Sequence, residues 1–170
     1  KLTELQLGEF RFDFGPSLFT MPQYVVEPFR AAGKDPKDYF TYISLPEACR
    51  YFYEDGTRFI APTNEDAFVE LASKTFDVSK EKLKGFMDEN RKIFENAGEV
   101  FLTHSLQKVK TWLQPKVVKS LFHSYVLNML KSMHQVTSKR LGDPKLVQLF
   151  DRYATYNGSS PYKASSILNS

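Results

Sequence analysis

The hydrophobic pattern of this 170-residue chain changes its period near residue 62, and this change restricts the fold more than any other feature. Before that point apolar and polar residues alternate, as in Phe10, Phe12 and Phe14, which is the period of a strand with one buried face. Farther along, apolar residues recur every three or four positions, as in amphipathic helices. The sequence therefore predicts one α+β domain over residues 1–170, strand-rich over 1–62 and helical over 63–170.

The strand-rich part is expected to form a small, aromatic-rich sheet that packs with the helices. Asp55-Gly56 between two aromatic runs is a strong hairpin signal. A short helix is expected between Pro22 and Gly33, although Pro28 lies inside it. The predicted strands are Glu9–Phe14, Tyr39–Leu45, Arg50–Tyr53 and Thr57–Ala61.

Capping residues mark the predicted helices of the second part. The first predicted helix follows Asn64, and the second follows Ser79 and continues to Phe101. The third runs from Pro115 to near Gly142, and the fourth begins at Asp143-Pro144. A turn is expected at 156–161.

Several kinds of chemistry have no sequence support. No two of the eight glycines are separated by a single residue, so the sequence contains neither a dinucleotide-binding fingerprint nor a phosphate-binding loop. The three histidines form no metal-binding motif and are interpreted as surface or core residues. A G-x-S-x-G nucleophile turn is also missing. The sequence predicts no metal site and identifies no catalytic residue.

Composition indicates the surroundings of the protein. Cys49 is the only cysteine, which favours a reducing compartment. The longest charge-free apolar stretch, Ser120 to Leu130, is far shorter than a membrane span. The chain begins at Lys1 without a signal pattern, so we expect a cytoplasmic piece of a longer protein. Fifteen Phe and nine Tyr suit a domain that lines an apolar ligand cavity.

One run of residues carries a specific resemblance. Phe12-Asp13-Phe14-Gly15-Pro16-Ser17 resembles the F-D-x-G-P-S segment of bacterial-type phytoene desaturases, which are FAD-dependent carotenoid desaturases. The similarity continues through 29–33 and 45–56 and ends with the run 149–161. In that family a G-x-G-x-x-G unit precedes this region and a second FAD segment follows it, and both are missing here. The resemblance therefore implies an excised substrate-binding segment that does not retain FAD.

The resemblance also implies a function and a set of site residues. The complete enzyme would introduce conjugated double bonds into a long apolar polyisoprenoid by hydride transfer to the flavin. Residues expected near the flavin are Asp13, Gly15 and Pro16. Residues expected along the substrate tunnel are Phe19, Met21, Arg50, Phe52, Met129 and Met133.

The same residues also fit ordinary structural roles. Gly15-Pro16 can be a plain strand-ending turn, Arg50 can pack its stem along a sheet edge, and methionines at helical spacing are often core. Two other functions stay open. One is another flavin-dependent carotenoid-modifying oxidoreductase, and the other is a lipid-carrier or peripheral membrane module without redox activity.

Charge is unevenly distributed along the chain. Residues 106–145 contain eight Lys/Arg and one acidic residue, so they carry +7 while the remainder carries −4. Nucleic-acid binding is disfavoured by the Leu, Val and Met content of this stretch. A hydrocarbon substrate is collected from a bilayer, so we expect a peripheral contact with the inner face of the membrane. The expected membrane-contact residues are Lys108, Lys110, Trp112, Lys116 and Lys119.

Overall fold

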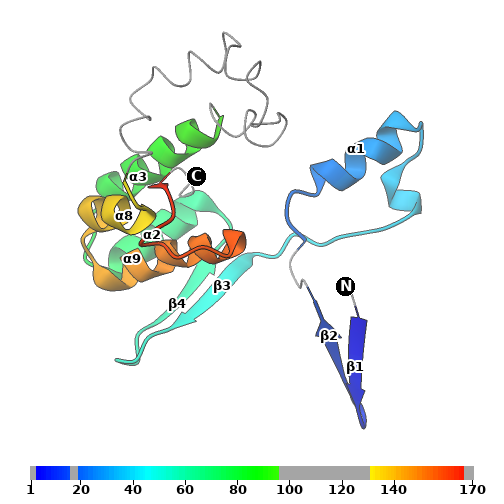
Figure 1. Cartoon of the computed structure of the whole chain (residues 1–170), viewed down its shortest axis with the longest axis horizontal. Coiled ribbons are helices and arrows are strands. Elements are labelled where there is room, and N and C mark those ends of the chain that lie inside the picture. The colour runs from blue at the N-terminus through cyan, green and yellow to red at the C-terminus, as the bar shows by residue number, and fades with distance from the viewer. Residues whose placement is uncertain (1–2, 16–18, 96–130, 167–170) are drawn as a thin grey trace. The chain divides into compact units, whose positions relative to one another are not determined.

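The computed structural model describes residues 3–15, 19–95 and 131–166 (Figure 1). It divides into two compact units, the first over residues 1–44 and the second over 45–170. The sequence analysis placed the internal boundary near residue 62. The hairpin that ends at Pro62 instead belongs to the same unit as the helices.

The first unit opens with an antiparallel hairpin of β1 (Thr3–Leu7) and β2 (Phe10–Phe14). Its register gives the ribbon two different faces, because side chains alternate along each strand. On the polar face, Arg11 donates hydrogen bonds of 2.8 Å to both Glu4 and Asp13. The sequence analysis predicted β2 and missed β1.

The other face of this hairpin is apolar and exposed. It pairs Leu5 with Phe12 and Leu7 with Phe10, and Phe14 extends it opposite Thr3. The sequence predicted a buried face for β2, which is wrong for the described residues, because all five residues of each strand are exposed. Alternation reveals an apolar face but not whether the same chain covers it.

The rest of the first unit contains α1 (Gln23–Ala31) and the short 3₁₀ helix η1 (Pro36–Asp38). Pro28 is accommodated within α1, and Asp35 accepts a 3.0 Å hydrogen bond from the Lys37 backbone at the start of η1. The strand predicted over 39–45 is wrong, since these residues have no paired strand and a strand needs a hydrogen-bonding partner.

The second unit opens with the predicted hairpin, formed by β3 (Glu47–Phe52) and β4 (Arg58–Pro62). The tight turn at Gly56 has φ of 83°, which glycine adopts at little cost. Among the described residues, this hairpin and β1–β2 form two separate two-stranded sheets, where the sequence predicted one small sheet. The coarser prediction of an α+β fold is confirmed.

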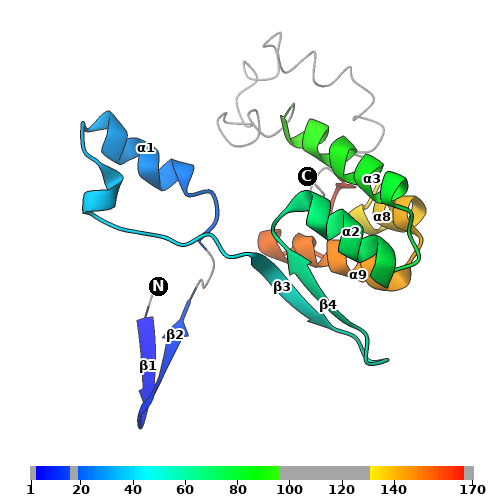
Figure 2. The same ribbon diagram turned by 180° about the vertical axis from the view of Figure 1, so that it is seen from behind.

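Helices pack against one face of β3–β4 in a continuous series. α2 contacts β4 and α3, α3 contacts α8, and α8 contacts α9, as the views from both sides show (Figures 1 and 2). The bounds are α2 Glu65–Thr75, α3 Lys80–Ile93, α8 Met133–Leu141, α9 Pro144–Asp151 and the 3₁₀ helix η3 Arg152–Asn157. The predicted caps Asn64, Ser79 and Asp143 are confirmed, because each side chain accepts a backbone hydrogen bond at its helix start.

The predicted third helix needs correction. Ser132 has φ of −71° and ψ of 156°, an extended conformation, and α8 begins after it with a capping box to Gln135. A helix continuous through 129–133 is therefore wrong, because the Ser132 hydroxyl and the Gln135 side chain satisfy backbone groups that a continuous helix would use. Residues 96–130, including the rest of that prediction, lie outside the described residues.

The core of the second unit is formed by the inner face of β4 and the four helices. Phe59 is 2% exposed and its ring lies 5.0 Å from that of Phe76 and 5.6 Å from that of Phe68. Leu83, Leu141 and Leu146 are fully buried in the same cluster, and they join α3, α8 and α9.

Tyr53 ties the β3–β4 hairpin to α9 by a 2.9 Å hydrogen bond from its hydroxyl to the Lys145 carbonyl. Burial, followed by the nearby Asp143 carboxylate, raises the pKa of Tyr53 from 10.0 to about 12. In the unfolded chain the phenol ionises at lower pH, so its contribution is complete below pH 10 and is lost as the pH rises toward 12.

We therefore expect a Tyr53→Phe variant to lose part of the stability decrease that the wild type shows between pH 10 and 12. The measurement is guanidinium unfolding at several pH values in this range. Tyr24→Phe, at a half-exposed tyrosine of α1, is the control and should keep the wild-type slope. An unchanged slope in Tyr53→Phe would contradict the assignment.

Candidate functional site

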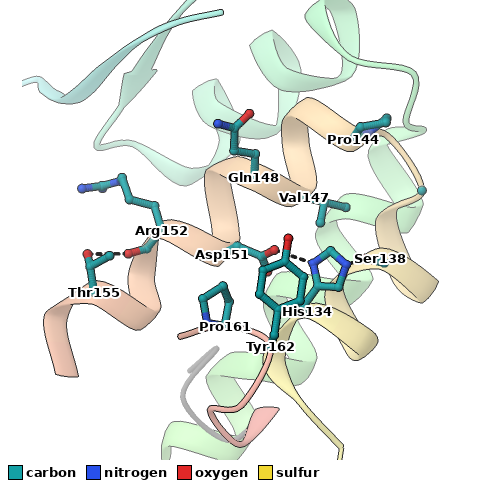
Figure 3. A pocket seen from close by; sticks show the side chains of 11 residues that line it. His134, Ser138, Pro144, Val147, Gln148, Asp151, Arg152, Thr155, Pro161 and Tyr162 are labelled. Atoms are coloured by element: carbon teal, nitrogen blue, oxygen red, sulfur yellow. Dashed lines mark hydrogen bonds and ion pairs between the residues drawn. The ribbon is translucent and has the colours of Figure 1, made fainter. Parts of the chain in front are cut away.

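A pocket of about 690 Å³ lies in the second unit beside α8, α9 and η3 (Figure 3). α8 contributes His134 and Ser138, and α9 contributes Val147 and Asp151. The other lining residues are Gly142, Pro144, Gln148, Arg152, Thr155, Pro161 and Tyr162. Apolar and polar groups therefore meet in one cavity, as they do in sites for amphipathic small molecules.

Three of these side chains form a hydrogen-bonded chain. His134 Nδ1 lies 2.6 Å from Asp151 Oδ2, and Ser138 Oγ lies 3.2 Å from His134 Nε2. A carboxylate oxygen only accepts, so Nδ1 carries a proton, and in the tautomer with its proton on Nδ1 the other nitrogen, Nε2, is an acceptor. The Asp151 side chain is only 11% exposed, and its Oδ1 is a buried atom without a hydrogen-bond partner among the described residues.

Backbone contacts fix the start of α8, from which His134 projects. Met133 N donates to Ala164 O at 2.8 Å, and His134 N donates to Pro161 O at 3.0 Å. These bonds satisfy backbone donors that a helix start leaves without intrahelical partners. The imidazole is further held by the Tyr162 ring, whose centroid lies 4.5 Å away. The pocket wall is therefore preorganised.

The Ser138–His134–Asp151 order matches that of a hydrolase triad, but the surroundings do not support acyl transfer. Ser138 lies inside α8 rather than on a sharp exposed turn. The backbone N–H groups of Lys145 and Leu146 at the start of α9 are not available as oxyanion donors, because both are bound to Asp143 at 2.9 Å. The arrangement is suited to binding a polar group.

Arg152 forms a second cluster at the rim of the pocket. Its guanidinium carbon lies 5.0 Å from the ring centre of Tyr153, 5.5 Å from that of Tyr51 and 5.7 Å from that of Tyr156. Its Nε donates to the Tyr51 hydroxyl at 3.2 Å. Burial raises the pKa of Tyr51, so this phenol stays neutral even where an exposed tyrosine would ionise, above pH 10.

In the first unit, aromatic rings gather beside α1. Phe29 lies 4.9 Å from Tyr39 and 5.6 Å from Phe40, and Phe19 lies 5.5 Å from Tyr42, measured between ring centroids. Phe19, Tyr39 and Tyr42 are about half exposed. Within the described part of the first unit only Val26 is buried, so this aromatic surface is open.

The residues expected near a flavin fall in and after β2. Asp13 is exposed and bonded to Arg11, and Gly15 has φ of 149°, a conformation that favours glycine. Pro16 lies outside the described residues.

The expected tunnel residues are not brought to one place. Phe19 belongs to the aromatic surface of the first unit, and Met21 beside it has φ of 52°. Arg50 and Phe52 lie on the exposed outer face of β3, where Arg50 pairs with Glu47. Met133 is fully buried beside Ala154 and Ala164. Met129 lies outside the described residues.

The expected membrane-contact residues Lys108, Lys110, Trp112, Lys116 and Lys119 also lie outside the described residues. Farther along the basic stretch, Lys145 bonds to Asp55 and Arg140 bonds to Glu89. No helix in the described part of the chain is both long and apolar enough to cross a bilayer. Across 3–15, 19–95 and 131–166, His, Cys, Asp and Glu side chains form no group of three suited to a metal ion.

The sequence analysis missed the pair of His134 and Asp151, which it did not treat as functional. One signal was present, because His134 and Ser138 are four residues apart and share a helix face. The approach of Asp151 depends on how α8 packs against α9, which local sequence does not encode.

No protein-family model matches the chain. Relatives nevertheless cover nearly all of it. The chain is 37% identical over 169 residues to a 1-hydroxycarotenoid 3,4-desaturase of Flavobacterium sp. (strain P99-3). It is 28% identical over 171 residues to a 4,4'-diapolycopene oxygenase of Methylomonas sp, and 27% identical over 177 residues to a 4,4'-diaponeurosporene oxygenase of Staphylococcus aureus (strain MRSA252).

Each of these matches covers 99% of this chain but 34% of the relative, so the chain spans about a third of the length of the curated relatives. The resemblance inferred from Phe12–Ser17 and from the runs 29–33, 45–56 and 149–161 is thus confirmed over 99% of the chain. Over nearly its whole length the chain is therefore similar to a segment of carotenoid desaturases and carotenoid oxygenases.

Proposed function

We propose that this chain is the substrate-binding segment of an FAD-dependent carotenoid desaturase that introduces conjugated double bonds into a long polyisoprenoid. The observation that carries the proposal is the 37% identity to a 1-hydroxycarotenoid 3,4-desaturase over 99% of the chain. Its expected partners are the apolar substrate and a membrane surface.

The exposed apolar surface of the first unit supports this proposal. Of the twenty exposed large hydrophobic side chains among the described residues, twelve belong to residues 1–44. Such a surface is unusual for a unit of this size unless something else covers it. A polyene offers only dispersion contacts and the hydrophobic effect, so its site must be built from side chains of this kind.

The described residues do not fit the dinucleotide part of FAD. A flavin pyrophosphate is held at an open helix start that follows a parallel strand, whereas both sheets here are antiparallel hairpins. The starts of α2, α3, α8 and α9 are each closed by a capping side chain. α1 has no such cap, but it follows an antiparallel hairpin rather than a parallel strand. We propose that FAD is bound by residues of the longer protein outside this chain.

The purified 170-residue chain is therefore expected to be colourless. The measurement is the visible spectrum after gel filtration in the presence of added FAD. Full-length protein prepared in the same way is the positive control. A yellow chain that keeps stoichiometric flavin would contradict the proposal.

A second candidate reaction is favoured by the relatives named as oxygenases at 27–28% identity. The same segment would then serve a carotenoid-modifying oxidoreductase that adds oxygen. One experiment separates the two: full-length protein is produced in cells that make phytoene or hydroxylated carotenoids, and the products are analysed by absorbance and mass. Longer conjugation with loss of two hydrogens supports the desaturase, and added oxygen supports the alternative.

We also propose that the basic stretch over 106–145 contacts an anionic membrane. Each basic residue near such a surface contributes on the order of 1 kcal/mol, so several together give salt-sensitive binding. The expected result is co-sedimentation with anionic vesicles at low salt that is lost when Lys108, Lys110, Lys116 and Lys119 are changed to Glu. A variant with Lys34, Lys37, Lys74 and Lys84 changed to Glu has the same net charge and should still bind. Equal binding by both variants would reject this surface.

A further inference from the structure

We propose that the pocket beside α8, α9 and η3 binds a hydroxyl group at the end of an apolar ligand. The chemical class of the ligand is an aliphatic alcohol. Its identity as the hydroxylated end of a polyisoprenoid rests on the proposed function, whereas the binding of an alcohol rests on the pocket alone.

The hydrogen-bond directions in the pocket favour a ligand group that donates a hydrogen bond. Asp151 Oδ2 accepts from His134 Nδ1 at 2.6 Å, and in the tautomer with its proton on Nδ1 the acceptor is Nε2. The Ser138 hydroxyl gives its single proton to Nε2 at 3.2 Å, so its oxygen still has lone pairs. Nε2 has a single lone pair, which the Ser138 proton occupies, so a ligand hydroxyl binds at Ser138 Oγ and must donate to it.

The remaining walls suit the carbon skeleton next to that hydroxyl. Pro144, Val147 and Pro161 line the pocket, and the Tyr162 ring lies 4.5 Å from the imidazole. Figure 3 shows the Tyr162 ring beside the His134–Asp151 contact, so apolar carbon and the acceptor pair lie next to each other. A branched alcohol can therefore place its hydroxyl at the acceptors and its methyl groups against the apolar walls.

The acceptor pair is held before any ligand binds. The backbone of His134 is anchored to Pro161 O, and its ring is anchored to an Asp151 side chain that is only 11% exposed. A fixed acceptor costs little ordering entropy on binding, which favours recognition of one group over simple hydrophobic adsorption.

The test compares two probes that share a skeleton, 2-methyl-2-hexanol and its methyl ether. Both are apolar and can accept a hydrogen bond, but only the alcohol can donate one. Binding to the full-length protein is followed by ligand-observed NMR. We expect the alcohol to bind about tenfold more tightly than the ether, as for one hydrogen bond to a preformed acceptor.

His134→Asn is the decisive variant. Its amide N–H can still donate to Asp151, which keeps the buried carboxylate paired, but no acceptor remains at the Nε2 position. The Ser138 proton is then free to bond to either probe. The alcohol and the ether should then bind with about equal affinity. Thr137→Val is the matched control, because Thr137 is the neighbouring buried hydroxyl on α8, bonds to Met133 O at 2.8 Å and does not line the pocket. It should keep the tenfold preference.

Three outcomes would overturn the proposal: no alcohol preference in the wild type, a preference that survives His134→Asn, or a preference lost equally in Thr137→Val. His134→Phe, which keeps an aromatic ring against Tyr162, is the second variant if the first fails to fold. Carotenoid products are assayed separately with the same protein. Selective alcohol binding without carotenoid turnover would refute the proposed function and leave the pocket supported, and the reverse would refute the pocket alone.

Discussion

Replacing Phe59 by alanine is expected to lower the free energy of unfolding of the second unit by about 3–5 kcal/mol, the range for a large aromatic removed from a packed core. Phe59 is 2% exposed and contacts the rings of Phe68 and Phe76. Truncation removes contacts to β3, α2 and the residue after α2 at once, and the surrounding backbone cannot collapse into the space. The measurement is denaturant unfolding followed by circular dichroism.

Phe52→Ala is the matched control for that experiment. Phe52 lies on the opposite face of the same hairpin, is 69% exposed, and has the Arg58 guanidinium 5.6 Å from its ring centre. Its loss should change the free energy of unfolding by less than about 1 kcal/mol. A large effect at Phe52 or a small one at Phe59 would contradict the inward and outward assignment of the hairpin faces.

Gly15→Val in the full-length protein is expected to reduce carotenoid turnover by about 100-fold or more. Gly15 has φ of 149°, which a β-branched residue rarely adopts, so the turn after β2 must change. If this turn lies beside the flavin, as the family resemblance implies, a displacement of about 1 Å at the reacting atoms has an effect of this size. Turnover is measured by polyene absorbance in cells that supply the carotenoid precursor.

The control is Gly85→Ala. Gly85 lies inside α3 with no atom within 4 Å of the added Cβ, so alanine should leave turnover unchanged and raise stability by up to about 1 kcal/mol. Circular dichroism of Gly15→Val should retain the helical signal of the second unit. Normal turnover in Gly15→Val would show that the turn is remote from the reaction.

Local signals in the sequence were sufficient for the elements whose ends are fixed by their own residues. Asn64, Ser79 and Asp143 each cap the helix that follows, and Asp55-Gly56 forms the turn between β3 and β4. Side-chain caps and glycine turns act within three or four residues, so a single sequence contains the information needed to predict them.

Elements that depend on distant partners were harder to predict. The aromatic run 39–45 has strand-like composition but no strand beside it. Ser132 caps the start of α8, where the sequence predicted a helix running through this residue. The candidate pocket belongs to this second class. Asp151 reaches His134 from another helix, and Tyr162 covers the imidazole from the segment that follows η3. These contacts exist only after packing.

The two-faced β1–β2 ribbon has a practical consequence for anyone who produces this chain alone. Leu5, Leu7, Phe10, Phe12 and Phe14 present a water-exposed apolar strip, and a two-stranded ribbon has unpaired hydrogen-bonding groups along both outer edges. Strips of this kind template strand-to-strand association between molecules. Concentrated preparations should therefore self-associate through this ribbon, and a charged residue in place of Phe10, its most exposed aromatic, is the simplest way to keep them monodisperse.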